Sequence, residues 1–138
     1  IPLQRIAYNA IPSVVYTNPE IACIGLTEKD LNEIKEGDFA PSMSSDEPFV
    51  PYEVHKLPMT YSGRFVAENE GETGLCKVIV DKRSKTIMGV HMIGNPCSEF
   101  VAAASFAVRM GYTVGEFKQV VFPHPTVGEV LREVIAEL

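Results

Sequence analysis

Two consecutive segments, 86–94 and 97–110, restrict the fold most, because each is apolar on more than one face. If 86–94 is a strand, the odd-numbered residues from 87 to 93 share one face, while Met88, Val90 and Met92 share the other. The second segment, CSEFVAAASFAVRM, has the length of a helix and is apolar almost all the way round. We therefore expect a central strand covered by helices, and a helix buried on several sides, one of them against another subunit.

Strand-like segments precede this pair and most helix signals follow it. The run at 12–28, broken by Asn18-Pro19, predicts a strand pair or a bent strand, and the segments 52–59, 64–69 and 75–81 predict further strands. Because the strands and helices do not alternate, the order predicts an α+β fold with a central antiparallel sheet flanked by helices, in one domain. The expected helix starts are a capping box at Thr27, Asn95-Pro96 as N-cap and first-turn proline, Thr113 and Thr126.

Charge and composition exclude several classes of partner. The net charge is −6 and no Lys/Arg cluster stands out, which argues against nucleic acid. The longest apolar run, 100–108, is far short of the ~20 residues that cross a bilayer, so no membrane partner is expected. The three cysteines form no CxxC pair and predict buried thiols in a reducing compartment, with the cytoplasm as the expected location. The segment 38–51, rich in Pro, Ser and acidic residues, predicts an exposed loop or insertion.

The chain lacks the motifs of a self-sufficient enzyme. It contains no GxGxxG or Walker-type loop, and His55, His91 and His124 are too far apart in sequence to predict a metal site. His91 lies in an apolar strand and is expected to be a core or edge residue, whereas His55, beside Lys56, is expected at the surface. The start IPLQ, without an initiator Met, suggests a piece of a longer protein.

His124 lies between two prolines in VFPHPTVGEV, and two interpretations of this stretch stay open. In the first, His124 is a turn residue, and Thr126 and Glu129 form a capping box for the last helix. In the second, His124 and Glu129 are a general acid-base pair, because imidazole titrates near neutral pH and a carboxylate fixes its tautomer. A glutamate at the third helical position reaches back over the helix N-terminus, so one side chain can serve both roles.

Three stretches resemble one enzyme family. HPTVGE resembles the HPT-x-x-E signature that closes the FAD-dependent pyridine nucleotide-disulfide oxidoreductases. IPSVVYTNPEIACIGLTE is similar to the opening of that family's C-terminal dimerisation domain, and KVIVDKRSKTIMGVHMIG with the alanine-rich helix is similar to its middle. The resemblance covers nearly all of the chain and about the last third of a complete family enzyme.

Within the family, YTNPE resembles the lipoamide dehydrogenase form, and three features depart from the usual pattern. Phe122 stands where another His is usual, Gly128 stands where Ser is usual, and 38–51 is longer than family members need. The resemblance implies that residues 1–138 are the homodimerisation domain of an enzyme that oxidises dihydrolipoamide with NAD through FAD and a redox disulfide. The FAD and NAD domains are missing, so no cofactor is expected on this fragment, which should be inactive alone.

The resemblance also assigns roles to residues near the end of the chain. His124 would exchange a proton with a dithiol at the partner subunit's disulfide, and Glu129 would orient its ring. His124 and the backbone of Pro125 would approach the partner's FAD, and the helices at 96–110 and 126–138 would form the symmetric interface. A 2-oxo acid dehydrogenase or glycine cleavage complex would be a further partner. The alternatives are a fragment of a glutathione-reductase-like enzyme and a non-catalytic, stand-alone dimerisation module.

Overall fold

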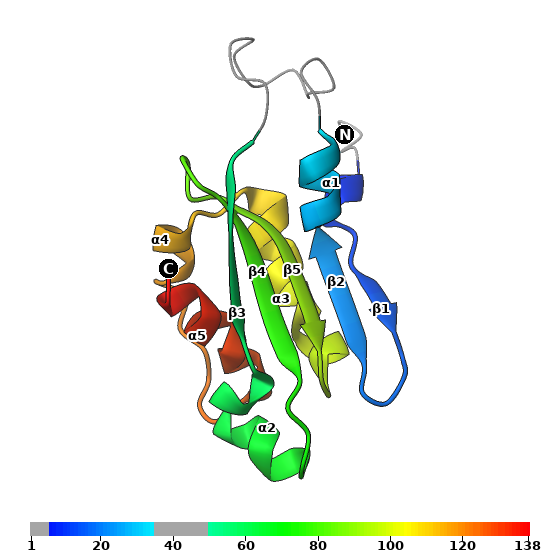
Figure 1. The fold of residues 1–138 in the computed structure, drawn as a ribbon. Helices are drawn as coiled ribbons and strands as arrows, with labels where there is room; N and C mark the ends of the chain where they lie inside the picture. Colours follow the sequence, from blue (N-terminus) through cyan, green and yellow to red (C-terminus); the bar gives the residue numbers. More distant parts are fainter. Residues whose placement is uncertain (1–5, 35–49) are drawn as a thin grey trace, which may run out of the picture.

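The computed structural model describes residues 6–34 and 50–138, so most of the predicted insertion at 38–51 lies outside the described residues. Within them, five strands form one antiparallel sheet in the order β1-β2-β5-β4-β3 (Figure 1). This confirms the predicted α+β fold with a central antiparallel sheet. The strands are β1 (Ser13–Val15), β2 (Ile21–Gly25), β3 (Tyr52–Leu57), β4 (Leu75–Asp81) and β5 (Ile87–Ile93).

The helical elements are short except for one. They are η1 (Tyr8–Ala10), α1 (Glu28–Glu33), η2 (Met59–Tyr61), α2 (Gly63–Glu68), α3 (Cys97–Met110), α4 (Val114–Phe117), η3 (Val127–Glu129) and α5 (Val130–Ala136). Capping boxes at Thr27 and Thr113 start α1 and α4, which confirms the predicted box at Thr27 and the predicted helix start at Thr113. No helix in the described part of the chain is long and apolar enough to span a membrane.

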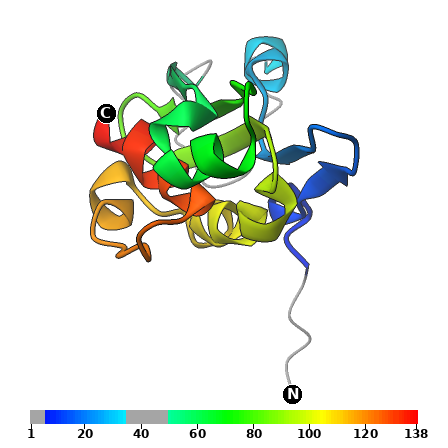
Figure 2. The same cartoon turned by 90° about the horizontal axis from the view of Figure 1, so that it is seen from below.

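β5 is the central strand, and the two faces of the sheet are covered differently. On one face, α3 and α5 bury Val78, Val90 and Met92 in the main core (Figures 1 and 2). On the other face, α1 covers only one end, through Leu31 and Ile79. The expectation of helices over β5 is therefore fully met on the first face and only partly on the second.

The thiols pack as small apolar groups. Cys76 and Cys97 are buried in the main core, and Cys23 is half-buried on β2; all three are free. Burial raises the pKa of Cys76 to about 12, so its thiol is protonated at neutral pH.

Two local predictions are wrong. Residues 64–69 form most of α2 rather than a strand, because the Ser62 side chain caps the turn by accepting the Phe65 N–H and Phe65 is the buried residue of the segment. Asn95 does not cap α3, whose N-cap is Pro96. The Asn95 side chain instead accepts the Glu20 N–H at 2.8 Å and donates to Asn18 at 2.8 Å, tying the β1–β2 turn to the start of α3.

Candidate functional site

The turn that carries His124 is fixed at its C-terminal end by the rest of the fold. The buried hydroxyl of Ser62 donates a hydrogen bond to the Thr126 carbonyl at 2.9 Å, which ties the turn to the start of α2. The Thr126 hydroxyl donates to the Pro123 carbonyl at 2.9 Å and closes the turn across His124. Val127 then enters the core. The backbone that carries the imidazole is thus fixed by the two hydrogen bonds of Ser62 and Thr126 and by the burial of Val127.

His124 and Glu129 are in direct contact. His124 Nδ1 lies 2.8 Å from Glu129 Oε1, and Glu129 Oε2 accepts the Thr126 N–H at 2.7 Å. One carboxylate therefore completes the capping box of the last helix and also binds the imidazole, and the acid-base role of the pair stays a prediction. The helix itself starts with the 3-10 turn η3 before α5.

The environment of Glu129 keeps its carboxyl ionised. The Thr126 N–H lowers the pKa of Glu129 most, its partial burial opposes this, and the bond to His124 lowers it further. An ionised carboxylate only accepts hydrogen bonds, so Nδ1 of His124 is the donor and Nε2 carries the lone pair in the neutral ring. The His124 side chain is 82% exposed and that of Glu129 only 14%. The free Nε2 is therefore accessible to solvent, while the carboxylate that holds the ring is mostly buried.

The lowered pKa of Glu129 predicts a pH-dependent loss of stability. Its ionised form stabilises the fold fully above its unfolded pKa near 4.5, and this contribution disappears as the pH falls through the lower folded value. We expect Glu129→Gln to be less stable than the wild type at pH 7, with a difference that shrinks as the pH falls below 4.5. Urea unfolding between pH 3 and 7 measures this difference. A difference that does not change with pH would contradict the assignment.

A groove of about 410 Å³ lies beside the His124 turn. Its walls are largely apolar, and its two charged residues, Arg64 and Glu68 of α2, are hydrogen-bonded to each other. Phe122, the residue in place of the family's usual His, packs against Phe117 with ring centroids 5.9 Å apart. The lining residues are Arg64, Glu68, Pro96, Phe100, Phe122, Pro123, Pro125, Thr126, Val127 and Gly128.

The other two histidines lie outside this site. His91 Nε2 is 2.9 Å from the Leu26 carbonyl, as expected for a satisfied strand residue, and burial lowers its pKa. His55 lies 3.6 Å from Glu53 on β3. Among residues 6–34 and 50–138, no group of three or more His, Cys, Asp or Glu side chains is arranged to hold a metal ion.

Sequence reasoning missed the groove. The sequence pattern predicts a strand for the segment that holds Arg64 and Glu68, and it predicts for Phe100 only a place in an apolar helix. The one local signal for α2 was Ser62, a good N-cap residue followed at the third helical position by Phe65.

Comparison with known proteins decides the family. Residues 11–135 match the pyridine nucleotide-disulphide oxidoreductase dimerisation domain. The chain belongs to this family. Its relatives include the mitochondrial dihydrolipoyl dehydrogenase of Caenorhabditis elegans, 37% identical over 94% of this chain and 23% of that protein. Dihydrolipoyl dehydrogenase 3 of Pseudomonas aeruginosa is 33% identical over 95% of this chain and 26% of that protein.

Solved structures show the same fold. LpdA from Mycobacterium tuberculosis superposes with a TM-score of 0.78 at 20% identity, over 97% of this chain and 26% of that one. The HOCl-induced flavoprotein disulfide reductase RclA from Escherichia coli, as its Cu(II) complex, gives 0.76 at 19% identity, over 94% and 26%. The dimerisation domain thus spans about a quarter of these proteins, rather than the third expected from the sequence.

Proposed function

We propose that this chain is the homodimerisation domain of a dihydrolipoyl dehydrogenase-type enzyme and supplies an acid-base pair to the partner subunit's active site. The observation that carries the proposal is the His124–Glu129 pair, whose ring is exposed while its carboxylate is held in place. Within the described part of the chain, Nε2 of His124 has no hydrogen-bond partner. This nitrogen is therefore available to react with a group that belongs to the other subunit.

The chemistry is a proton transfer that makes a thiolate. Disulfide exchange requires the thiolate, and a free thiol is mostly protonated at pH 7. Nε2 of His124 takes the S–H proton of a dithiol, giving a thiolate and an imidazolium, and returns it to a leaving thiolate in the reverse direction. Glu129 donates no proton; it stabilises the imidazolium through Nδ1–H and keeps the ring in one tautomer.

The groove suits the organic part of such a substrate. Its walls are made by Phe100, Phe122 and prolines. The opposite charges of Arg64 and Glu68 neutralise each other through their hydrogen bond. An apolar dithiol arm is therefore a better occupant than a peptide disulfide rich in carboxylates. This favours a lipoyl-type substrate over a glutathione-like one.

FAD and NAD belong to the complete enzyme in this proposal. FAD would accept the two electrons of the redox pair once the substrate has reduced its disulfide to a dithiol, and the exposed edge formed by His124 and Pro125 is the part of this chain that would lie beside it. A 2-oxo acid dehydrogenase or glycine cleavage complex, the cytoplasmic location and the inactivity of the isolated chain stay predictions; the C. elegans relative is named as mitochondrial.

Hybrid dimers of the complete enzyme test whether the site is shared between subunits. One subunit carries His124→Gln and the other lacks the redox disulfide, so each homodimer is expected to be nearly inactive. In the hybrid, the intact His124 of one subunit meets the intact disulfide of the other, which should restore one of two sites and about half of the wild-type activity. A hybrid as inactive as its parents would show that both groups act within one subunit.

A further inference from the structure

The turn around His124 is not held by backbone hydrogen bonds of its own. Within the described part of the chain, residues 121–125 make no backbone–backbone hydrogen bond, and the two prolines beside His124 have no N–H to donate. The position of the imidazole therefore depends on side chains that bond this backbone. Those bonds meet at Thr126.

Thr126 is hydrogen-bonded through its hydroxyl, its N–H and its carbonyl. The hydroxyl donates to the Pro123 carbonyl at 2.9 Å, and the N–H donates to Glu129 Oε2 at 2.7 Å. The carbonyl accepts the Ser62 hydroxyl at 2.9 Å. The first two bonds are local, whereas the third joins residues that are 64 positions apart in sequence. Ser62 therefore supplies a fixed point outside the turn.

The surroundings of Ser62 hold it rigidly. The residue is 2% exposed, its N–H donates to the Met59 carbonyl at 3.0 Å, and its hydroxyl oxygen accepts the Phe65 N–H at 3.2 Å. Met59 and Phe65 are fully buried in the main core. α2 packs against η3, so Ser62 lies beside the start of the last helix (Figure 1). A path of hydrogen bonds thus leads from the core through Thr126 and Glu129 to the exposed imidazole.

We propose that Ser62 is a positioning residue for the His124–Glu129 pair. Its bond to the Thr126 carbonyl fixes Thr126, whose N–H in turn holds the carboxylate that orients the imidazole. This rests on the proposed acid-base role of His124 and extends it to a buried side chain that does not line the groove. The position matters because a base must lie within hydrogen-bond reach of its proton, and a displacement of about 1 Å can cost about 10²-fold in rate.

A purely structural role of Ser62 makes different predictions. Ser62 caps α2, and α2 carries Arg64 and Glu68 on the wall of the groove. On that account, loss of the hydroxyl should disturb the groove, raise KM and lower turnover whether or not His124 is present. On the positioning account, the loss lowers kcat with little change in KM, and it has no further effect once His124 is gone.

Ser62→Gly in the complete enzyme separates the two accounts. Glycine is tolerated at an N-cap nearly as well as serine, but it cannot donate the bond to Thr126. With dihydrolipoamide, kcat should fall roughly tenfold to hundredfold while KM stays within about twofold. Ser62→Thr keeps the hydroxyl and should stay within about threefold of the wild type. In the His124→Gln enzyme, adding Ser62→Gly should lower kcat by less than about twofold.

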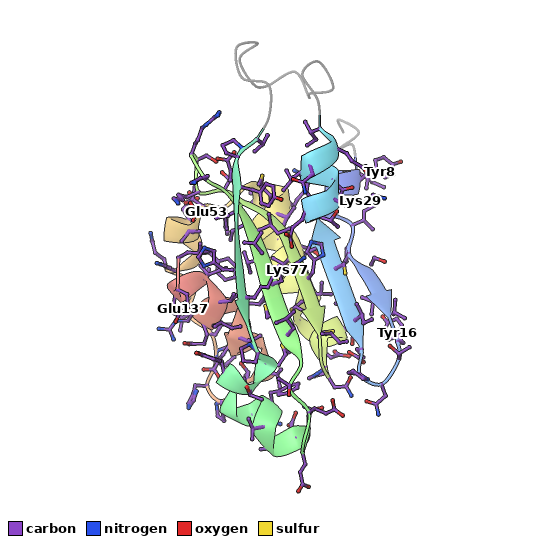
Figure 3. The ribbon with its side chains drawn as sticks, viewed as in Figure 1. Tyr8, Tyr16, Lys29, Glu53, Lys77 and Glu137 are labelled. Carbon is purple, nitrogen blue, oxygen red and sulfur yellow. The ribbon has the colours of Figure 1, made fainter. Side chains whose placement is uncertain are left out.

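Thr27→Gly is the matched control, because it removes another hydroxyl N-cap far from the site. Thr27 caps α1 by accepting the Asp30 N–H at 3.1 Å. Figure 3 places Lys29 of α1 and Glu137, which follows α5, at opposite edges of the view. The variant should leave kcat within about twofold of the wild type and should leave the imidazole of His124 unchanged.

Nitrogen NMR of the 138-residue chain measures the positioning without turnover, with circular dichroism to check folding. At a pH where the ring is neutral, the bond to Glu129 keeps the proton on Nδ1 of His124 in the wild type. Ser62→Gly should shift the ring toward a mixture of its two tautomers.

The outcomes separate the positioning role from the proposed function. A wild-type tautomer in Ser62→Gly, a raised KM in place of a lowered kcat, or an equal loss of kcat in the His124→Gln enzyme would each overturn the positioning role. A mixed tautomer in Ser62→Gly together with normal turnover of His124→Gln would contradict the acid-base function and leave the positioning role standing.

Discussion

Replacing His124 by Gln in the complete enzyme is expected to lower kcat by roughly 10²–10⁴-fold, the range typical for losing a general acid-base group. Gln can still donate a hydrogen bond to Glu129 but cannot take a proton from a thiol. Because the ring is exposed and contributes little to packing, the variant should fold, dimerise and bind FAD as the wild type does. Steady-state kinetics with dihydrolipoamide, together with the flavin absorbance spectrum, measure these outcomes.

His55→Gln is the matched control, because it makes the same substitution at a histidine outside the site. It should leave kcat within about twofold of the wild type. Near-normal turnover of His124→Gln would mean that His124 is only a turn residue and that the capping role of Glu129 is its whole function.

Phe65→Ala is expected to lower the free energy of unfolding by about 3–5 kcal/mol. Phe65 is fully buried and is the anchor of α2 in the main core. A Cβ at Gly94 would lie 3.0 Å from its ring, which shows how closely the backbone approaches it. Truncation leaves a cavity beneath the helix that carries Arg64 and Glu68. Urea unfolding at a fixed protein concentration measures the loss, which is a large share of the ~5–15 kcal/mol of a typical domain.

Val66→Ala, one residue further along α2, is the control that distinguishes the loss of Phe65 packing from a general effect of substitution in this helix. Val66 is 51% exposed, so its truncation should change the free energy of unfolding by less than about 0.5 kcal/mol. Similar losses for the two variants would mean that α2 contributes through its backbone rather than through Phe65.

The central sheet could be predicted because its signal is local. β5 has apolar residues on both faces, β2 alternates over its five residues, and β4 is a continuous apolar run at its buried end. α2 could not be predicted in this way, because a six-residue segment with one buried residue fits a strand as well as a helix. The hydrogen bonds of the Asn95 side chain could not be predicted from the sequence for another reason. Its partners, Asn18 and Glu20, are more than 70 residues away, and local sequence favours the N-cap that it does not form.

The same distinction applies to the candidate site. The His124–Glu129 contact spans five residues and follows from the reach of a glutamate in the first helical turn. The groove joins three segments, 64–68, 96–100 and 122–128, whose proximity is created by the packing of α2 and α3 against the last turn. Its apolar character depends on Phe122, a residue whose packing against Phe117 no local pattern predicts.

Because each oxygen of Glu129 has its own hydrogen-bond partner, few residues can replace glutamate at position 129. One oxygen serves the start of the last helix and the other serves His124. Gln could satisfy the helix without the charge, and Asp would carry the charge on a shorter arm, so neither replaces both bonds. A mutational scan read out by abundance should therefore penalise Gln at this position only in part, while one read out by turnover should reject it. A position that differs between two such scans marks a residue where folding and chemistry share one side chain.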